Sequence, residues 1–443
     1  MSKTFRPWDV DQVWLLPPSI QDLVPAGHVA HFVRETVRDG LELSRIMETY
    51  EEERGYPPYH PGMMVALLLY AYSQGVYSSR RIARGCEERL DFAAVTGMQR
   101  PDFRTISDFR KRHLAALGEL FQQVLKLCQA AGLVKLGHVS LDGTKIKANA
   151  SKHKAMSYGR MKQAEPALAA EVHRWLAQAA QTDKAEDRQL GRERRGDEMP
   201  DWAADKVRRL EKIHAAKAVL EAEARAAARR KGEDGPPAGA HRDKPGRKPK
   251  PPSEAPSDKA QRNFTDPDSR IMKTKDGFIQ GYNAQAAVDG HAQVVVAHGL
   301  TNATTDQAQL APLLEAVKAN AGKNPGEASA DAGYCSEANL RTLARRRIKG
   351  YIATGRQRHG TTAAVKQRAS RPGSRVARMT AKLKRAGRRS RYRLRKQIVE
   401  PVFGQIKHAR GFRQFLLRGL DKVKAEWAIL CTVHNLLKLA AAA

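Results

Sequence analysis

The stretch His138-Val139-Ser140-Leu141-Asp142-Gly143-Thr144-Lys145-Ile146-Lys147-Ala148 marks the point where the chain changes from helical to strand-forming sequence. Two short runs with strand character, 138–141 and 145–148, predict strands. Asp142-Gly143 lies between these runs and is a strong turn signal, so the stretch predicts a β-hairpin. On this interpretation Asp142 is a turn residue, and a chemical role for it depends on the rest of the chain.

Two further carboxylates lie in short motifs far along the chain. Asp331 follows the run Glu327-Ala328-Ser329-Ala330 and precedes Ala332-Gly333-Tyr334, and Glu400 lies just after a dense basic run. Two Asp and one Glu offer the oxygen ligands that Mg²⁺ prefers. Two such ions about 3.5–4 Å apart can activate an attacking oxygen and stabilise a leaving one. The three carboxylates therefore predict a metal-dependent site for phosphodiester chemistry.

The composition indicates a polyanionic partner. The chain has 443 residues and a formal net charge of +31, with 78 Lys and Arg against 47 Asp and Glu. Phosphate neutralisation by such a surplus releases condensed counterions and drives binding. A ribosomal or RNA-binding protein would carry the same surplus, so charge alone does not name the polymer. Four scattered cysteines without metal-binding spacing, no signal-peptide core and no membrane-length apolar run predict a cytoplasmic protein.

Residues 1–133 predict a helical N-terminal domain. A buried helix begins at Pro61, and the last predicted helix, 106–117, is capped by Thr105. That helix would expose three basic residues, Arg110, Lys111 and Arg112. Several short helices ending in a basic one are typical of a helix-turn-helix reader of DNA. A helical bundle with a solvated charged face explains the pattern equally well.

Residues 134–150 begin an α/β part, and residues 151–275 interrupt it. The interruption contains two Ala-rich segments, 166–181 and 201–231, that predict a helical hairpin. The segment 232–259 is rich in Pro, Lys, Gly and Ser and predicts a disordered basic linker.

The α/β part resumes over residues 276–443. Strands are predicted at 281–289 and 293–297, followed by alternating helices and short strands, which together describe a mixed sheet covered by helices. Asp331 would lie at the carboxyl end of a strand, where open sheets bind their ligands.

A basic run leads directly into Glu400. Between Lys366 and Val399 there are fourteen Lys or Arg and no Asp or Glu, which predicts a phosphate-tracking surface. If the segment is helical, the side chains that share the face of Glu400 include three cations, Arg393, Lys396 and Lys407. We expect these three residues and Arg395 to bind DNA. Pro401 should kink this helix or start a new one. An ordinary surface ion pair remains the alternative role for Glu400.

Four motifs in this order resemble the DDE transposases of bacterial insertion sequences. They are 101–110 (Pro-Asp-Phe-Arg-Thr-Ile-Ser-Asp-Phe-Arg), 141–151 around Asp142, 330–334 around Asp331 and 399–407 around Glu400. The resemblance implies an RNase H-like catalytic core and a catalytic metal-binding triad of Asp142, Asp331 and Glu400.

The resemblance also implies cofactors and partners. It implies two Mg²⁺ ions per site, with Mn²⁺ as a substitute, double-stranded DNA carrying terminal inverted repeats, target DNA, and a homodimer that brings two ends together. Many relatives carry a Tyr-Arg-Glu-Lys signature, with Arg four residues before the Glu. Here Lys396 occupies that position, and Tyr392 and Arg395 each lie one residue early. A two-metal nuclease without strand transfer and a non-catalytic DNA-binding regulator remain the alternatives.

Overall fold

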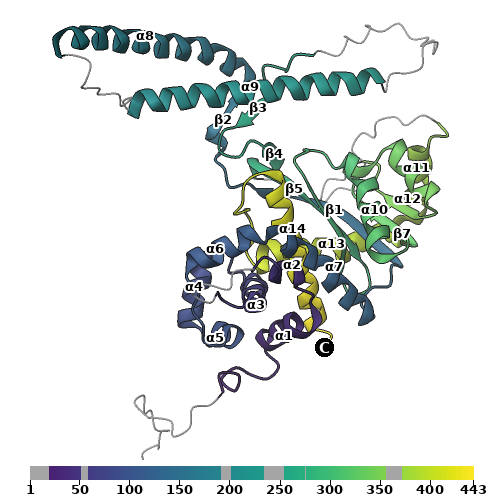
Figure 1. Cartoon of the computed structure of the whole chain (residues 1–443). Helices are drawn as coiled ribbons and strands as arrows, with labels where there is room; N and C mark the ends of the chain where they lie inside the picture. The colour runs from purple at the N-terminus through teal and green to yellow at the C-terminus, as the bar shows by residue number, and fades with distance from the viewer. Residues whose placement is uncertain (1–18, 51–57, 191–200, 234–253, 275, 356–371) are drawn as a thin grey trace, which may run out of the picture.

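The computed structural model describes residues 19–50, 58–190, 201–233, 254–274, 276–355 and 372–443. A cluster of helices from the N-terminal third lies beside a twisted sheet, and a long helical arm projects from the sheet's edge (Figure 1). None of the helices in the described ranges is long and apolar enough to cross a membrane.

The predicted mixed sheet is confirmed. Its order is β4-β5-β1-β7-β8, and β6 also pairs with β5. The central strand β1 (His138–Lys147) runs antiparallel to β5 (Gly277–Asp289) and parallel to β7 (Glu327–Ala330). The remaining strands are β4 (Arg270–Thr274), β6 (Val295–Thr301) and β8 (Lys349–Ile352). The helices α10 (Leu310–Ala321), α13 (Arg395–Gly404) and α14 (Leu420–Ala440) pack on this sheet.

The predicted hairpin at Asp142-Gly143 is wrong. β1 continues through both residues, with Asp142 opposite Ala286 and Gly143 opposite Gln285 of β5. Pairing along a long neighbouring strand overrides the local turn preference. Gly143 is still required, because a Cβ there would lie 2.3 Å from the Gln285 amide nitrogen.

The last predicted N-terminal helix, 106–117, is in fact two helices. Asp102, not Thr105, caps α6 (Phe103–Arg112), and His113 separates α6 from α7 (Leu114–Ala130). The preceding helices are α1 (Val29–Glu35), α2 (Ser44–Met47), α3 (Pro61–Ser73), α4 (Ser79–Glu88) and α5 (Leu90–Thr96). The predicted buried helix at Pro61 is confirmed by α3. These helices share one continuous apolar core with the sheet and α14, so packing does not break at residue 133.

Pro401 neither ends nor restarts its helix. It lies inside α13, which runs on into a π-helical turn at Gln405–Ala409. Proline cannot donate a hydrogen bond to the carbonyl four residues earlier. The Gln293 side-chain amide donates to that Gln397 carbonyl instead, at 2.8 Å. A side chain from a distant loop thus satisfies the acceptor that Pro401 leaves free.

The predicted helical hairpin is confirmed as the projecting arm, α8 (Tyr158–Leu190) and α9 (Asp201–Glu233). A two-stranded sheet of β2 (Ala155–Ser157) and β3 (Gln261–Asn263) closes its base. Of the segment predicted to be disordered, 234–253 lies outside the described residues. Its last part is ordered against α8, where the Gly159 amide donates to the Asp258 carbonyl at 3.1 Å.

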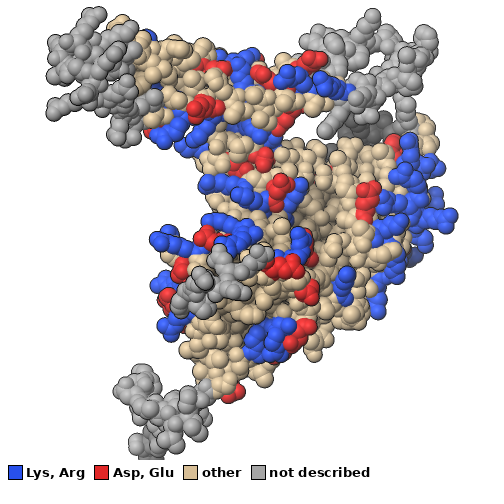
Figure 2. All heavy atoms as spheres, in the orientation of Figure 1, with Lys and Arg blue, Asp and Glu red and all other residues tan. Residues whose placement is uncertain are grey.

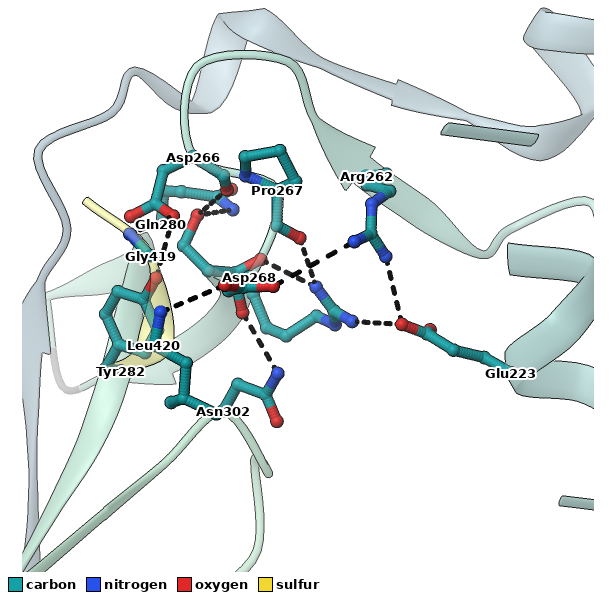
Figure 3. Close-up of polar contacts among 12 residues, drawn as sticks. Glu223, Arg262, Asp266, Pro267, Asp268, Gln280, Tyr282, Asn302, Gly419 and Leu420 are labelled. Atoms are coloured by element: carbon teal, nitrogen blue, oxygen red, sulfur yellow. Dashed lines mark hydrogen bonds and ion pairs between the residues drawn. The ribbon is translucent and has the colours of Figure 1, made fainter. Parts of the chain in front are cut away.

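Polar contacts fix the base of the arm to the sheet and to α14 (Figure 3). Glu223 of α9 accepts hydrogen bonds from Arg262 and Arg270, at 3.0 and 2.9 Å. The buried Asp266 carboxylate accepts from the Tyr282 hydroxyl of β5 and the Gly419 amide before α14. The arm is therefore joined to the core by specific polar contacts at its base.

The buried amide of Asn435 ties α14 to the sheet edge. It donates to the Val295 carbonyl and accepts from the Val295 N–H, each at 2.8 Å, beside a register shift between β5 and β6. Asn435→Ala should lower the free energy of unfolding by about 2–4 kcal/mol, because both backbone groups lose their partner. Urea denaturation measures this. The half-buried Asn320, with one bond to Val296, is the control, and equal losses at both sites would contradict the prediction.

Candidate active site

Strand pairing brings Asp142 and Asp331 together. β1 and β7 are parallel neighbours with Leu141 opposite Ala330, and each aspartate is the next residue. Asp331 then caps a short 3₁₀ turn, where its Oδ1 accepts from the Gly333 amide at 2.9 Å. The two carboxylates therefore lie at the same level of the sheet.

Arg395 connects the third carboxylate to the first. Its guanidinium donates to Asp142 Oδ2 at 2.8 Å and to Glu400 Oε1 at 2.9 Å. The side chains of Arg395 and Asp142 are about one-sixth exposed, whereas that of Glu400 is 43% exposed. Because α13 packs on β1, Glu400 reaches the site from a helix rather than from the sheet.

Burial dominates the electrostatics of this site. It raises the pKa of Asp142 to about 7, against the opposing effect of the Arg395 charge and with further repulsion from Asp331 and Asp306. Burial and then the Asp306 charge raise the pKa of Asp331. Carboxylates that repel one another in a poorly solvated site favour a bound cation.

The structure adds Asp306, which the sequence reasoning missed. Its Oδ1 accepts from the side-chain amides of Asn283 and Gln285 in β5, both at 2.7 Å. A signal was present in the sequence. Asn283 and Gln285 are two residues apart in a predicted strand, flanked by Tyr282, Ala284 and Ala286, which places two polar side chains on one face of the strand.

The oxygen-rich donor set fits a hard divalent cation. Within the described part of the chain, no group of three His, Cys, Asp or Glu side chains is already arranged to hold a metal ion. The Arg395 guanidinium supplies the positive charge between Asp142 and Glu400. Arg395 thus joins Asp142 to Glu400, and the pairing of β1 with β7 sets Asp331 beside Asp142.

Arg395, which lies one residue early in the signature, donates a hydrogen bond to Asp142, whereas Lys396 at the expected spacing is exposed. Tyr392 is half-buried, and burial raises its pKa. Lys407 donates to Thr144 Oγ1 at 2.9 Å and to the Lys145 carbonyl, so it fixes the π-helical turn to β1. Arg393, two residues before Arg395 in the chain, is exposed.

One predicted DNA contact is wrong. Arg110 is buried and donates to the Tyr72 hydroxyl, the Tyr77 carbonyl and Ser79 Oγ, so it holds α3, α4 and α6 together. Arg110 lies four residues after the buried Ile106, on the same face of α6, and this face packs inward. Lys111 and Arg112 are exposed at the end of α6.

Glu426, an acidic residue of α14, is structural. Its buried carboxylate accepts from the Leu416 and Leu417 amides at 3.1 Å.

The raised pKa of Asp142 predicts a pH-dependent stability difference. A carboxyl group whose pKa is 3.8 unfolded and about 7 folded stabilises the fold below pH 4 and loses that contribution as pH rises through 7. Asp142→Asn removes the ionisation. In metal-free buffer with EDTA it should exceed the native chain in stability at pH 8 by up to about 4 kcal/mol. Chemical denaturation at several pH values should show the two converging below pH 4, and a constant difference would refute this.

Two family models match the chain. The model described as Transposase domain (DUF772) matches residues 18–112, and the model described as Transposase DDE domain matches residues 247–436. Asp331 and Glu400 lie within the second match, whereas Asp142 lies outside both. No curated protein and no solved structure matches the chain. The two transposase matches, on either side of β1, place the chain in the family of DDE transposases of insertion sequences, and it functions as a DNA transposase.

Proposed function

We propose that Asp142, Asp331 and Glu400 are the metal-binding triad of this transposase, in a sheet of the RNase H-like type. The observation that carries the proposal is the Arg395 guanidinium, which joins Asp142 to Glu400 beside Asp331. Two Mg²⁺ ions, or Mn²⁺ in their place, would supply activation of the attacking oxygen and stabilisation of the leaving oxygen. The reaction would be hydrolysis at the end of the element, followed by attack of the freed 3′-OH on target DNA.

The protein's own residues would hold and orient the DNA around the triad. Arg393 and Lys396 lie exposed just before Glu400 and would pair with phosphates near the scissile bond. When cations bind to the carboxylates, the Arg395 guanidinium would release Asp142 and Glu400 and donate its hydrogen bonds to a phosphate oxygen instead. Lys407 keeps α13 in register with β1, so that Glu400 stays close to Asp142.

Basic side chains also gather over the edge of the molecule formed by α11 (Glu337–Arg345) and α12 (Arg375–Ala386), as Figure 2 shows. The exposed basic residues of these two helices are Arg341, Arg345, Arg378, Lys382, Lys384 and Arg385. α12 carries no acidic residue. This surface would guide double-stranded DNA toward the triad, and two copies of the chain would bring two inverted repeats together.

The triad is tested by removing one charge at a time. Asp142→Asn, Asp331→Asn and Glu400→Gln should each reduce cleavage of an end-containing duplex at least a hundredfold, because metal ligation needs anionic oxygens. Binding of the same duplex should stay within about threefold, since the cationic surface is unchanged.

The matched control is Asp421→Asn, whose side chain is 97% exposed on α14. It should cleave normally. Retained cleavage in any triad variant would remove that residue from the triad. An assay for joined products, run alongside, separates a transposase reaction from simple nuclease cleavage.

The N-terminal helices would recognise the terminal repeat through Lys111 and Arg112. A Lys111→Ala, Arg112→Ala double variant should bind the repeat about tenfold more weakly, and the slope of log Kd against log salt should fall by about two. Fluorescence anisotropy at several salt concentrations measures both. Arg110→Ala should instead lower the melting temperature. If the double variant binds end and random DNA like the native chain, recognition lies elsewhere.

A further inference from the structure

Asp306 is held in an unusual way for its position. It precedes the short 3₁₀ helix Gln307–Gln309, where an aspartate ordinarily caps the helix, but its side chain makes no capping hydrogen bond. Its Oδ1 accepts instead from Asn283 and Gln285, which are 1% and 0% exposed. Both donors are neutral amides, so these hydrogen bonds fix the carboxylate without neutralising its charge.

The two amides are themselves rigidly oriented. The Gln285 side-chain oxygen accepts from the Tyr334 hydroxyl, and its amide nitrogen also donates to Asn283 Oδ1 at 3.0 Å. The Gln285 carbonyl accepts from the Trp427 indole at 3.0 Å. Because Tyr334 ends the turn that begins at Asp331, this network links Asp306 to the second aspartate of the proposed triad.

Two glycines let Asp306 approach the site. A Cβ on Gly333 would lie 3.1 Å from Asp306 Oδ2 and 3.0 Å from Asp331 Oδ1, so both oxygens border one small space. A Cβ on Gly143 would lie 2.7 Å from Asp306 Oδ1. Gly143 and Gln285 face each other on the side of the sheet opposite the Asp142 side chain, because successive strand residues alternate. Asp306 therefore reaches Asp331 from the opposite side of the sheet.

We propose that Asp306 is a fourth carboxylate of the metal site, a positioning residue that acts through Asp331 and raises its affinity for divalent cations. The inference rests on the proposed triad. Asp306 would then add a negative charge behind Asp331, while the Arg395 guanidinium opposes the charges of Asp142 and Glu400. Outer carboxylates that orient metal ligands commonly strengthen metal binding by 10–100-fold.

The test measures Mn²⁺ binding to the full-length protein without DNA, by calorimetry and electron paramagnetic resonance. Asp306→Asn keeps the shape and the acceptor for both amides but removes the charge, so the Kd for Mn²⁺ should rise at least tenfold. In cleavage assays the Mn²⁺ concentration for half-maximal rate should rise by the same factor, with the rate at saturation within about threefold of native. Asp421→Asn should change neither value.

Gly333→Ala gives a second, independent variant, since it keeps every carboxylate and fills the space between Asp306 and Asp331. It should weaken Mn²⁺ binding at least threefold. Native Mn²⁺ affinity in either folded variant overturns the role of Asp306, as does an equal loss in Asp421→Asn. If Asp142→Asn binds Mn²⁺ like the native chain, the triad itself fails, whatever Asp306 does.

Discussion

The uninterrupted strand β1 is the constraint on which the rest of this structure depends. It pairs with β5 on one side and with β7 on the other, and Asp142 lies within its length. Parallel pairing with β7 sets Asp331 beside Asp142, and packing of α13 on β1 brings Glu400 to the same place. A shift of β1 by one residue would turn Asp142 to the other face of the sheet and separate it from Arg395.

Several negatively charged side chains lie close together at this site. Burial raises the pKa of Asp142 and Asp331, and repulsion from Asp306 adds to both. Hydrogen bonds from Arg395 to Asp142, and from the Asn283 and Gln285 amides to Asp306, partly offset the unfavourable burial and repulsion of these carboxylates. Functional sites commonly retain such unfavourable charge, because a ligand of opposite sign then binds more strongly. A divalent cation bound at the proposed site would offset the repulsion among these carboxylates.

Local sequence was sufficient for the strands that end near Asp331 and for the arm, because these depend on hydrophobic pattern and helix propensity. It was insufficient wherever a distant partner decides the outcome. Asp142-Gly143 has turn chemistry, but β5 holds it in a strand. Pro401 should disturb α13, but the Gln293 amide satisfies the carbonyl it leaves free. Arg110 is basic, which suggested an exposed position, but it lies on the buried face of α6 and binds groups of α3 and α4. Asp306 carries no local signal, and only the amides of β5 reveal it.

The packing of α14 has a consequence for biosynthesis. This last helix contributes Trp427 and Asn435 to the core that the N-terminal helices and the sheet share. During translation α7 and β1 leave the ribosome long before their partners α14 and β5 have been synthesised, since these partners lie far along the chain. The nascent chain therefore cannot complete this core until α14 has been synthesised. Products truncated before Leu420 would lack α14, and the apolar faces of α7 and β6 that pack on it would stay uncovered.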